Sequence, residues 1–141
     1  MFEDFGNAVA SALAYSAIGI ILMVLGYFLV DLLTPGKLGE IIWVHRNRNA
    51  ALLLSSNSLG VGLIVVGAIW ASSGDLVEGI VSTLVFGVIG LAAMAVSFIV
   101  MDLLTPGKLG EICTSEEPQP AVWVNSAMHL AVGGVIAMAL S

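Results

Sequence analysis

Carboxylate, hydroxyl and amine groups recur together in one eleven-residue phrase, DLLTPGKLGEI, found at Asp31–Ile41 and again at Asp102–Ile112. An acid, a threonine and a lysine at a repeated spacing could bind an ion or dock a charged partner. The alternative is structural. Proline moves the preceding residue out of the α region, so each phrase would end a helix, with its aspartate held by threonine, lysine or backbone donors. The candidate polar or ion site consists of Asp31, Thr34, Lys37, Asp102, Thr105 and Lys108.

A second polar group interrupts two otherwise apolar stretches. It consists of Ser55, Asn57, Ser58, Asn125, Ser126 and His129. Helical periodicity places Ser55 and Ser58 on one face with Gly62, and we expect this face to turn inward because polar groups are costly against lipid. The same holds for Ser126 and His129. Two interpretations stay open: hydrogen bonds between closely packed helices, or a proton or ion relay through the histidine, which can titrate near neutrality.

Opposite charges occupy two corresponding segments that follow the repeated phrases. The first, HRNR at residues 45–48, is basic, and the second, EEPQ at residues 116–119, is acidic. They could pair head to tail, within one chain or between neighbouring chains. Unconstrained variation of two solvated loops is the alternative. The candidate pairing residues are Arg46, Arg48, Glu116 and Glu117.

Signatures of catalysis and of cofactor binding are missing from the sequence. It contains no paired-histidine metal motif, no phosphate-binding loop and no nucleophile–base pair at a recognised spacing. The single cysteine, Cys113, would lie in a reducing compartment, where we expect neither a disulfide nor chemistry. The net charge of −6 lacks the basic footprint that nucleic-acid binding needs. We therefore expect no catalytic residue, no metal, no cofactor and no nucleic-acid partner.

Four long apolar stretches must position these groups. Charged residues make up 10% of the chain, against about a quarter in soluble domains, and the mean hydropathy is +1.07. About 20 apolar residues cross the hydrocarbon core of a bilayer as a helix. Because Glu3 and Asp4 precede the first stretch, it does not resemble a cleavable signal and should remain as a span. The sequence predicts an all-α integral membrane protein with transmembrane helices at Ala8–Leu33, Ala50–Ala71, Gly79–Leu104 and Ala121–Leu140.

An internal repeat relates the first two stretches to the last two. Sliding the chain by 71 residues places Asp31 on Asp102 and needs no gap. This period predicts a tandem duplication of a two-helix hairpin, with units at residues 1–71 and 72–141. Since each unit crosses the membrane twice, the two units would be parallel and related by a pseudo-two-fold axis along the membrane normal.

The basic residues predict the orientation of the chain. All four lie in the two connections that follow the first and third stretches, whereas the N-terminal segment and residues 72–78 carry only acids. Cytoplasmic loops are enriched in lysine and arginine. We therefore expect both lysine-bearing loops to be cytoplasmic and both termini to lie outside.

The doubled phrase, in a small chain with four spans, resembles the bacterial YjfL-like family, known as domain of unknown function 350. The resemblance covers nearly the full length, with a two-helix repeat and an Asp-x-x-Thr-Pro element at each first-helix end. It implies the multi-pass architecture and a place in the bacterial inner membrane, so that the termini expected outside from the basic residues would be periplasmic. It also gives a loose connection with membrane maintenance, because genes of the family often lie beside envelope-stress and ATP-grasp-type neighbours. The matching residues are Asp31, Thr34, Pro35 and Glu40, with Asp102, Thr105, Pro106 and Glu111 as counterparts.

Two functions are compatible with these features. The leading hypothesis is a small oligomeric inner-membrane protein that acts as a channel-like or membrane-stress and envelope-maintenance component. Four spans are few for a self-contained transporter, so a solute path would form between copies or around the two corners. The alternative is a non-conducting scaffold whose two TPGKLGE loops recruit a cytoplasmic protein. The expected partners are the lipid bilayer, further copies of the chain and, in the alternative, that cytoplasmic protein.

Overall fold

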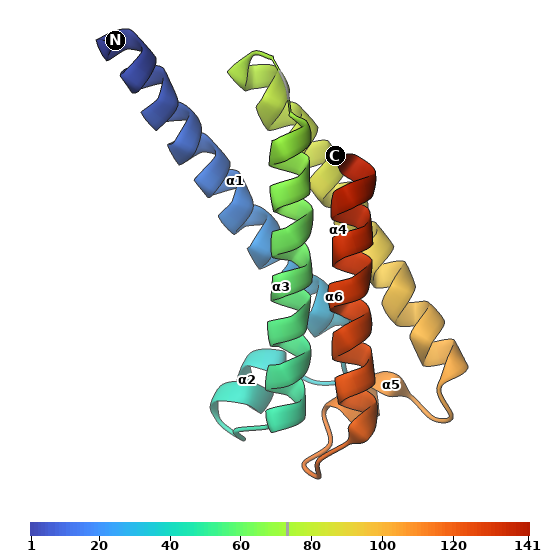
Figure 1. Cartoon of the computed structure of the whole chain (residues 1–141). Coiled ribbons are helices and arrows are strands. Elements are labelled where there is room, and N and C mark those ends of the chain that lie inside the picture. The colour runs from blue at the N-terminus through green and yellow to red at the C-terminus, as the bar shows by residue number, and fades with distance from the viewer. Residues whose placement is uncertain (73) are drawn as a thin grey trace.

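The structure of the chain, a computed structural model, describes residues 1–72 and 74–141, and this described part contains helices and no strand (Figure 1). Four of the described helices are long and apolar enough to cross a membrane. They are α1 (Phe2–Leu33), α3 (Arg48–Ala71), α4 (Leu76–Leu104) and α6 (Pro120–Leu140). The prediction of an all-α membrane protein with four spans is confirmed. Two short helices that the sequence did not predict, α2 (Leu38–Trp43) and α5 (Leu109–Cys113), follow the repeated Thr-Pro-Gly segments.

The two repeated phrases end α1 and α4 as expected. Thr34 and Thr105 both have extended backbone at the C-terminal caps of these helices, because each precedes a proline. Gly36 and Gly107 then have φ values of 86° and 99°, a left-handed conformation that glycine adopts without a steric penalty. Each phrase therefore stops a long helix and turns the chain directly into a short one.

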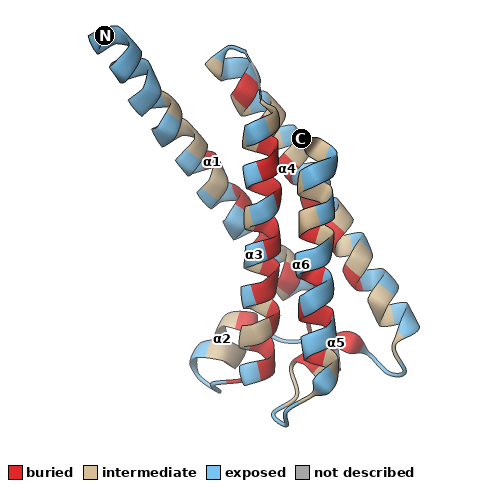
Figure 2. Ribbon diagram, in the orientation of Figure 1, coloured by how far each residue is buried: buried red, intermediate tan, exposed pale blue. Residues whose placement is uncertain are grey.

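Helix α3 is the core of the bundle. Half of its apolar span, 50%, is buried inside the chain, compared with 22% of the corresponding window in α1 and 28% in α4 and α6. It packs against α1, α4 and α6, and Figure 2 shows the resulting buried stripe along its length. The exposed surfaces of the other spans are rich in large apolar side chains, as a lipid-facing surface requires.

The contact between α3 and α6 is close enough to bring their backbones together. A Cβ on Gly60 would lie 2.8 Å from the His129 carbonyl oxygen, and a Cβ on Gly133 would lie 2.6 Å from the Gly60 Cα. Near the other end of the same contact, a Cβ on Gly67 would lie 2.6 Å from the Ala137 carbonyl oxygen. Glycine at these positions permits the short interaxial distance that stabilises helix pairs in lipid.

Both repeated phrases lie at one end of the bundle, together with α2 and α5 (Figure 1). The N- and C-termini lie at the other end, and the first half of α1 extends away from the remaining helices. Residues 1–10 are accordingly exposed. The shared side of the two phrases agrees with the parallel arrangement expected from the repeat, whereas the side of the membrane that they face stays a prediction.

Candidate functional site

Each aspartate of the repeated phrases closes its own corner by accepting a backbone hydrogen bond. The Leu38 N–H donates to Asp31 Oδ1 at 2.6 Å, and the Leu109 N–H donates to Asp102 Oδ1 at 2.6 Å. These donors are the first residues of α2 and α5, where the helix dipole favours a carboxylate. The sequence left threonine, lysine or backbone donors open as partners of these aspartates, and in the structure the donors are backbone N–H groups.

The threonines bond to the preceding helix turn. Thr34 Oγ1 donates to the Val30 carbonyl oxygen at 2.9 Å, and Thr105 Oγ1 donates to that of Met101 at 2.7 Å. Together with the aspartate bonds, these contacts recur at the 71-residue period in both halves. The two corners therefore have the same internal structure.

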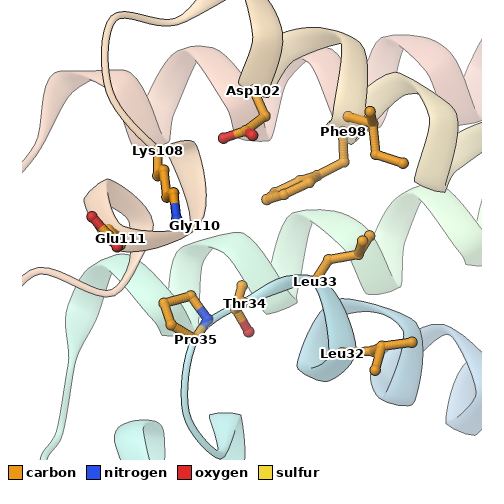
Figure 3. Close-up of a pocket in the computed structure, with 10 residues that line it drawn as sticks. Leu32, Leu33, Thr34, Pro35, Phe98, Asp102, Lys108, Gly110 and Glu111 are labelled. Carbon is orange, nitrogen blue, oxygen red and sulfur yellow. The ribbon is translucent and has the colours of Figure 1, made fainter.

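Both corners contribute to a hollow of about 320 Å³ between the ends of α1 and α4 and helix α5. We call it the corner hollow. Figure 3 shows Asp102 and Lys108 across from Thr34 and Pro35, so residues of both repeated phrases meet there. Its lining consists of Leu32, Leu33, Thr34, Pro35, Phe98, Ile99, Asp102, Lys108, Gly110 and Glu111.

A pseudo-two-fold relation between the two phrases would allow each aspartate to pair with the lysine of the other phrase, but the described residues of the corner hollow form no such ion pair. No ion pair within 4.0 Å joins Asp31 to Lys108 or Asp102 to Lys37 among residues 1–72 and 74–141. Each carboxylate instead turns toward the N-terminus of its own short helix, and Lys37 is exposed outside the hollow. The structure brings Asp102, Lys108 and Thr34 together, but not the full set of six.

Three polar residues of α6 are buried at the depth of the membrane. Asn125, Ser126 and His129 are 1%, 5% and 2% exposed. In the described part of the chain, both polar atoms of the Asn125 side chain, Ser126 Oγ and His129 Nδ1 have no hydrogen-bond partner. The His129 ring stacks on Phe98 with the centroids 6.1 Å apart. Ser126 and His129 lie inside the bundle, as predicted, and Asn125 lies there with them. Interhelical hydrogen bonds, one of the two interpretations, are not formed by these atoms in the described residues.

On α3 the face predicted to turn inward, with Ser55 and Ser58, is not the inner one, whereas Asn57 lies inside the bundle. The Asn57 amide is buried and donates to the Gly26 carbonyl oxygen at 3.3 Å. Ser55 is exposed and bonds to its own helix, and Ser58 is only half-buried. The inner face instead contains Ser56, because the close contact at Gly60 selects the face of α3 that turns toward α6. The alignment of the two halves of the chain wrongly predicted that α3 and α6 turn corresponding faces inward.

The loops at residues 44–49 and 114–119 do pair, but through amides. Asn47 Nδ2 donates to the carbonyl oxygens of Thr114 and Ser115 at 2.7 and 2.9 Å. Asn49 Nδ2 donates to those of Ser115 and Glu117 at 2.9 and 2.6 Å. Asn47 Oδ1 also caps α3. An asparagine just before an apolar helix was the sequence signal for this role.

The four charged residues proposed to pair across these loops form no ion pair with one another within 4.0 Å in the described residues. Arg48 and Glu116 share the lining of a second hollow, whereas Arg46 is exposed with a left-handed φ of 54°. An amide provides both a donor and an acceptor to a loop backbone at a fixed reach, which a long arginine side chain does not. Among the described residues, charge pairing between these two loops is therefore absent within one chain.

Cys113 is buried in the apolar cluster beneath the first corner. Burial raises the pKa of its thiol to about 11, so the thiol stays protonated at neutral pH and is a poor nucleophile. In the part of the chain that the structure describes, no group of three His, Cys, Asp or Glu side chains is arranged to hold a metal ion.

Comparisons with known proteins agree with this architecture. Residues 4–140 match the family model described as Domain of Unknown Function (DUF350). The chain is 33% identical over 135 residues to UPF0719 transmembrane protein Mb2631 of Mycobacterium bovis, covering 96% of the chain and 89% of the relative. A UPF0719 transmembrane protein of Mycolicibacterium paratuberculosis is 34% identical with the same coverage. No solved structure matches.

Proposed function

Because the chain belongs to the family described as Domain of Unknown Function (DUF350), with curated relatives that are transmembrane proteins, we propose that it is a non-catalytic scaffold of the bacterial inner membrane. In this proposal both corners face the cytoplasm, and the corner hollow docks a cationic segment of a cytoplasmic protein. The observation that carries the proposal is the corner hollow, where residues of both repeated phrases meet at one end of the bundle.

The chemistry of the corner hollow supports a cationic ligand. Asp102 and Glu111 supply two carboxylates against the single amine of Lys108. An excess of carboxylates attracts a lysine or arginine side chain and disfavours an acidic one. Leu33 and Phe98 add apolar surface beside these charges, which suits a side chain that flanks the cation.

The packing of α3 and α6 supports docking over conduction through a single chain. Their backbones touch at Gly60 and Gly133, so no space for a solute remains between them at that point. A path along the two central helices would require this contact to open, at the cost of the packing that stabilises it.

A photocrosslinking amino acid at position 111 tests the docking role in intact cells. We expect it to yield an adduct with one cytoplasmic protein, joined near a lysine or arginine. The same amino acid at position 40 is the matched control, because Glu40 is the counterpart of Glu111 but does not line the corner hollow. Equal adducts from both positions, or none from position 111, would contradict the proposal.

Conduction between copies of the chain is the second candidate, and the unpartnered Asn125, Ser126 and His129 favour it. Buried polar groups without partners in a membrane often mark a solute or proton path. Vesicles containing the purified protein should then pass protons faster than empty vesicles, and His129→Leu should remove the difference. Proton flux equal to that of empty vesicles would exclude this candidate and leave the scaffold.

A further inference from the structure

The contact between α3 and α6 joins different faces of two corresponding helices. The 71-residue period pairs Gly133 with Gly62, yet Gly133 packs against Gly60. If a pseudo-two-fold axis related the two helices, the contact of Gly133 with Gly60 would be repeated as a contact of Gly62 with Ala131. A Cβ on Gly62, however, meets nothing within 4 Å. The contact is therefore heterologous: each hairpin contributes a patch that the other hairpin leaves unused.

The unused patches carry the same kinds of residue as the used ones. Met94 packs against Gly60 and is 1% exposed, whereas its counterpart Met23 is 37% exposed. Ile64 is 1% exposed, whereas its counterpart Val135 is 68% exposed. Surfaces suited to packing in an interior thus remain open at both ends of the two-hairpin unit.

The open patch of the first hairpin forms a groove centred on Gly62, with a volume of about 430 Å³. Contact with lipid chains does not require glycine or serine, whereas close approach of a second helix does. The open patch of the second hairpin is a ridge on α6 that includes Ala131 and Val135. The groove is lined by Met23, Ser58, Leu59, Gly62, Leu63, Val66 and Leu130.

The corners show the same asymmetry at a different place from the contact between α3 and α6. A Cβ on Gly110 would lie 3.0 Å from Pro35 Cδ and 3.2 Å from the Leu33 carbonyl oxygen, so the first corner is seated on α5. The equivalent seat would place the second corner on α2 at Gly39. Within the chain the second corner does not occupy that position, where a Cβ on Gly39 would lie 2.9 Å from the Tyr27 hydroxyl, and Leu104 of the second corner is 74% exposed.

We propose that chains join head to tail in the membrane, with the second hairpin of one chain packing on the first hairpin of the next. The ridge at Ala131 enters the groove at Gly62, and the second corner sits on α2 of the neighbour. All copies keep one orientation, so the assembly closes into a ring when the rotation between hairpins divides a full turn. The contact between chains is wider at one end than the α3–α6 contact within a chain. There the pair Val66 and Met138 takes the position that Ala137 and Gly67 have within the chain. This proposal goes beyond the docking function and does not depend on it.

Cysteine crosslinking in membranes tests the direction of the contact. With copper phenanthroline, Gly62→Cys and Ala131→Cys in one chain should give a ladder of dimers, trimers and larger species. Each single variant should stay monomeric, and a mixture of the two should stop at the dimer. The parent is the control, because its one thiol is buried. No ladder from the double variant would overturn the proposal, as would strong self-crosslinking of Gly62→Cys, which indicates a two-fold contact.

A bulky residue in the groove provides a second test. Gly62→Leu should reduce the assembly to monomers in nanodiscs, measured by mass, because the new side chain fills the space of the neighbouring helix. Its helix content should match the parent, since a Cβ at Gly62 meets nothing within 4 Å and the groove leaves space for the rest of the side chain. Gly6→Leu, at another open glycine, is the matched control and should assemble normally. An unchanged mass of Gly62→Leu would overturn the proposal.

Discussion

The Cys113 thiol shows how one apolar surrounding determines the chemistry of a residue. It is fully buried beside Leu38 and Val122, where the neutral thiol is favoured over the thiolate. Burial raises the pKa of this group from 9.0 to about 11. The folded state therefore keeps a proton that the unfolded state loses between these values. Stability contributed by this group is present below pH 9.0 and is lost as the pH rises toward about 11.

Maleimide labelling checks this residue directly. At pH 8 Cys113 in the folded protein should react very slowly, and labelling should become fast only after unfolding in detergent and urea. Ser141→Cys, at an exposed position, should label quickly in the same protein and so confirms access of the reagent. Rapid labelling of the parent thiol in the folded state would show that Cys113 is not buried.

We expect substitution of an asparagine in the paired loops to destabilise the protein, and substitution of the neighbouring charged residues to leave its stability unchanged. Asn47→Ala removes a helix cap and two bonds to the facing loop, and should lower the unfolding free energy by about 1–2 kcal/mol. The substitutions Arg46→Glu and Glu117→Arg, made singly or together, should leave the unfolding free energy unchanged. Unfolding titrations in mixed micelles measure both. A loss in each single swap that the double swap restores would revive charge pairing.

At the scale of elements, α3 and α6 act as one unit because their backbones touch. Glycine carries no side chain between them, so dispersion contacts form along the whole interface. The short helices α2 and α5 have a different role. Each begins directly after an N-cap lysine that follows a left-handed glycine, and its first N–H is bonded to an aspartate of the preceding long helix.

Gly60→Ala measures how much this contact contributes. The added methyl group would lie 2.8 Å from the His129 carbonyl oxygen, a backbone atom that cannot move aside alone. We expect a loss of about 1–3 kcal/mol in the free energy of unfolding in mixed micelles. Gly134→Ala is the matched control on α6, since its Cβ meets nothing within 4 Å. Equal stability of the two variants would contradict the close contact.

At the scale of the whole molecule, the two corners share one end and the two termini share the other (Figure 1). All four basic residues lie at the corner end. Translocation of lysine and arginine is disfavoured, so the corner end should be cytoplasmic. The scaffold and the head-to-tail assembly are both compatible with this orientation, because the corner hollow opens at the corner end and the α3–α6 faces lie within the bilayer.

Reporter fusions test the orientation. Alkaline phosphatase fused after Ser141 should be active, because it folds only outside the cytoplasm, whereas fusion after Ser115 should be inactive. A fluorescent protein that matures only in the cytoplasm should give the reverse pattern at each position. The opposite result for both reporters would place the corners and the corner hollow outside, and would exclude a cytoplasmic partner for this site.

The sequence by itself determined the spans, the helix ends and the corners, because these depend on local terms. Hydropathy over about 20 residues defines a transmembrane helix. Proline after Thr34 ends α1, and a glycine at position 36 allows the turn. The doubled phrase also correctly indicated the family.

Only the tertiary structure decided which faces meet. Ser55 and Ser126 are counterparts, yet the first is exposed and the second is buried. The same periodicity predicted an inward face for both. Which face of a helix turns inward depends on how closely its neighbour approaches, and Gly60 rather than Gly62 permits that approach. The repeated phrase is identical in the two halves, so the different surroundings of its two copies arise from long-range packing.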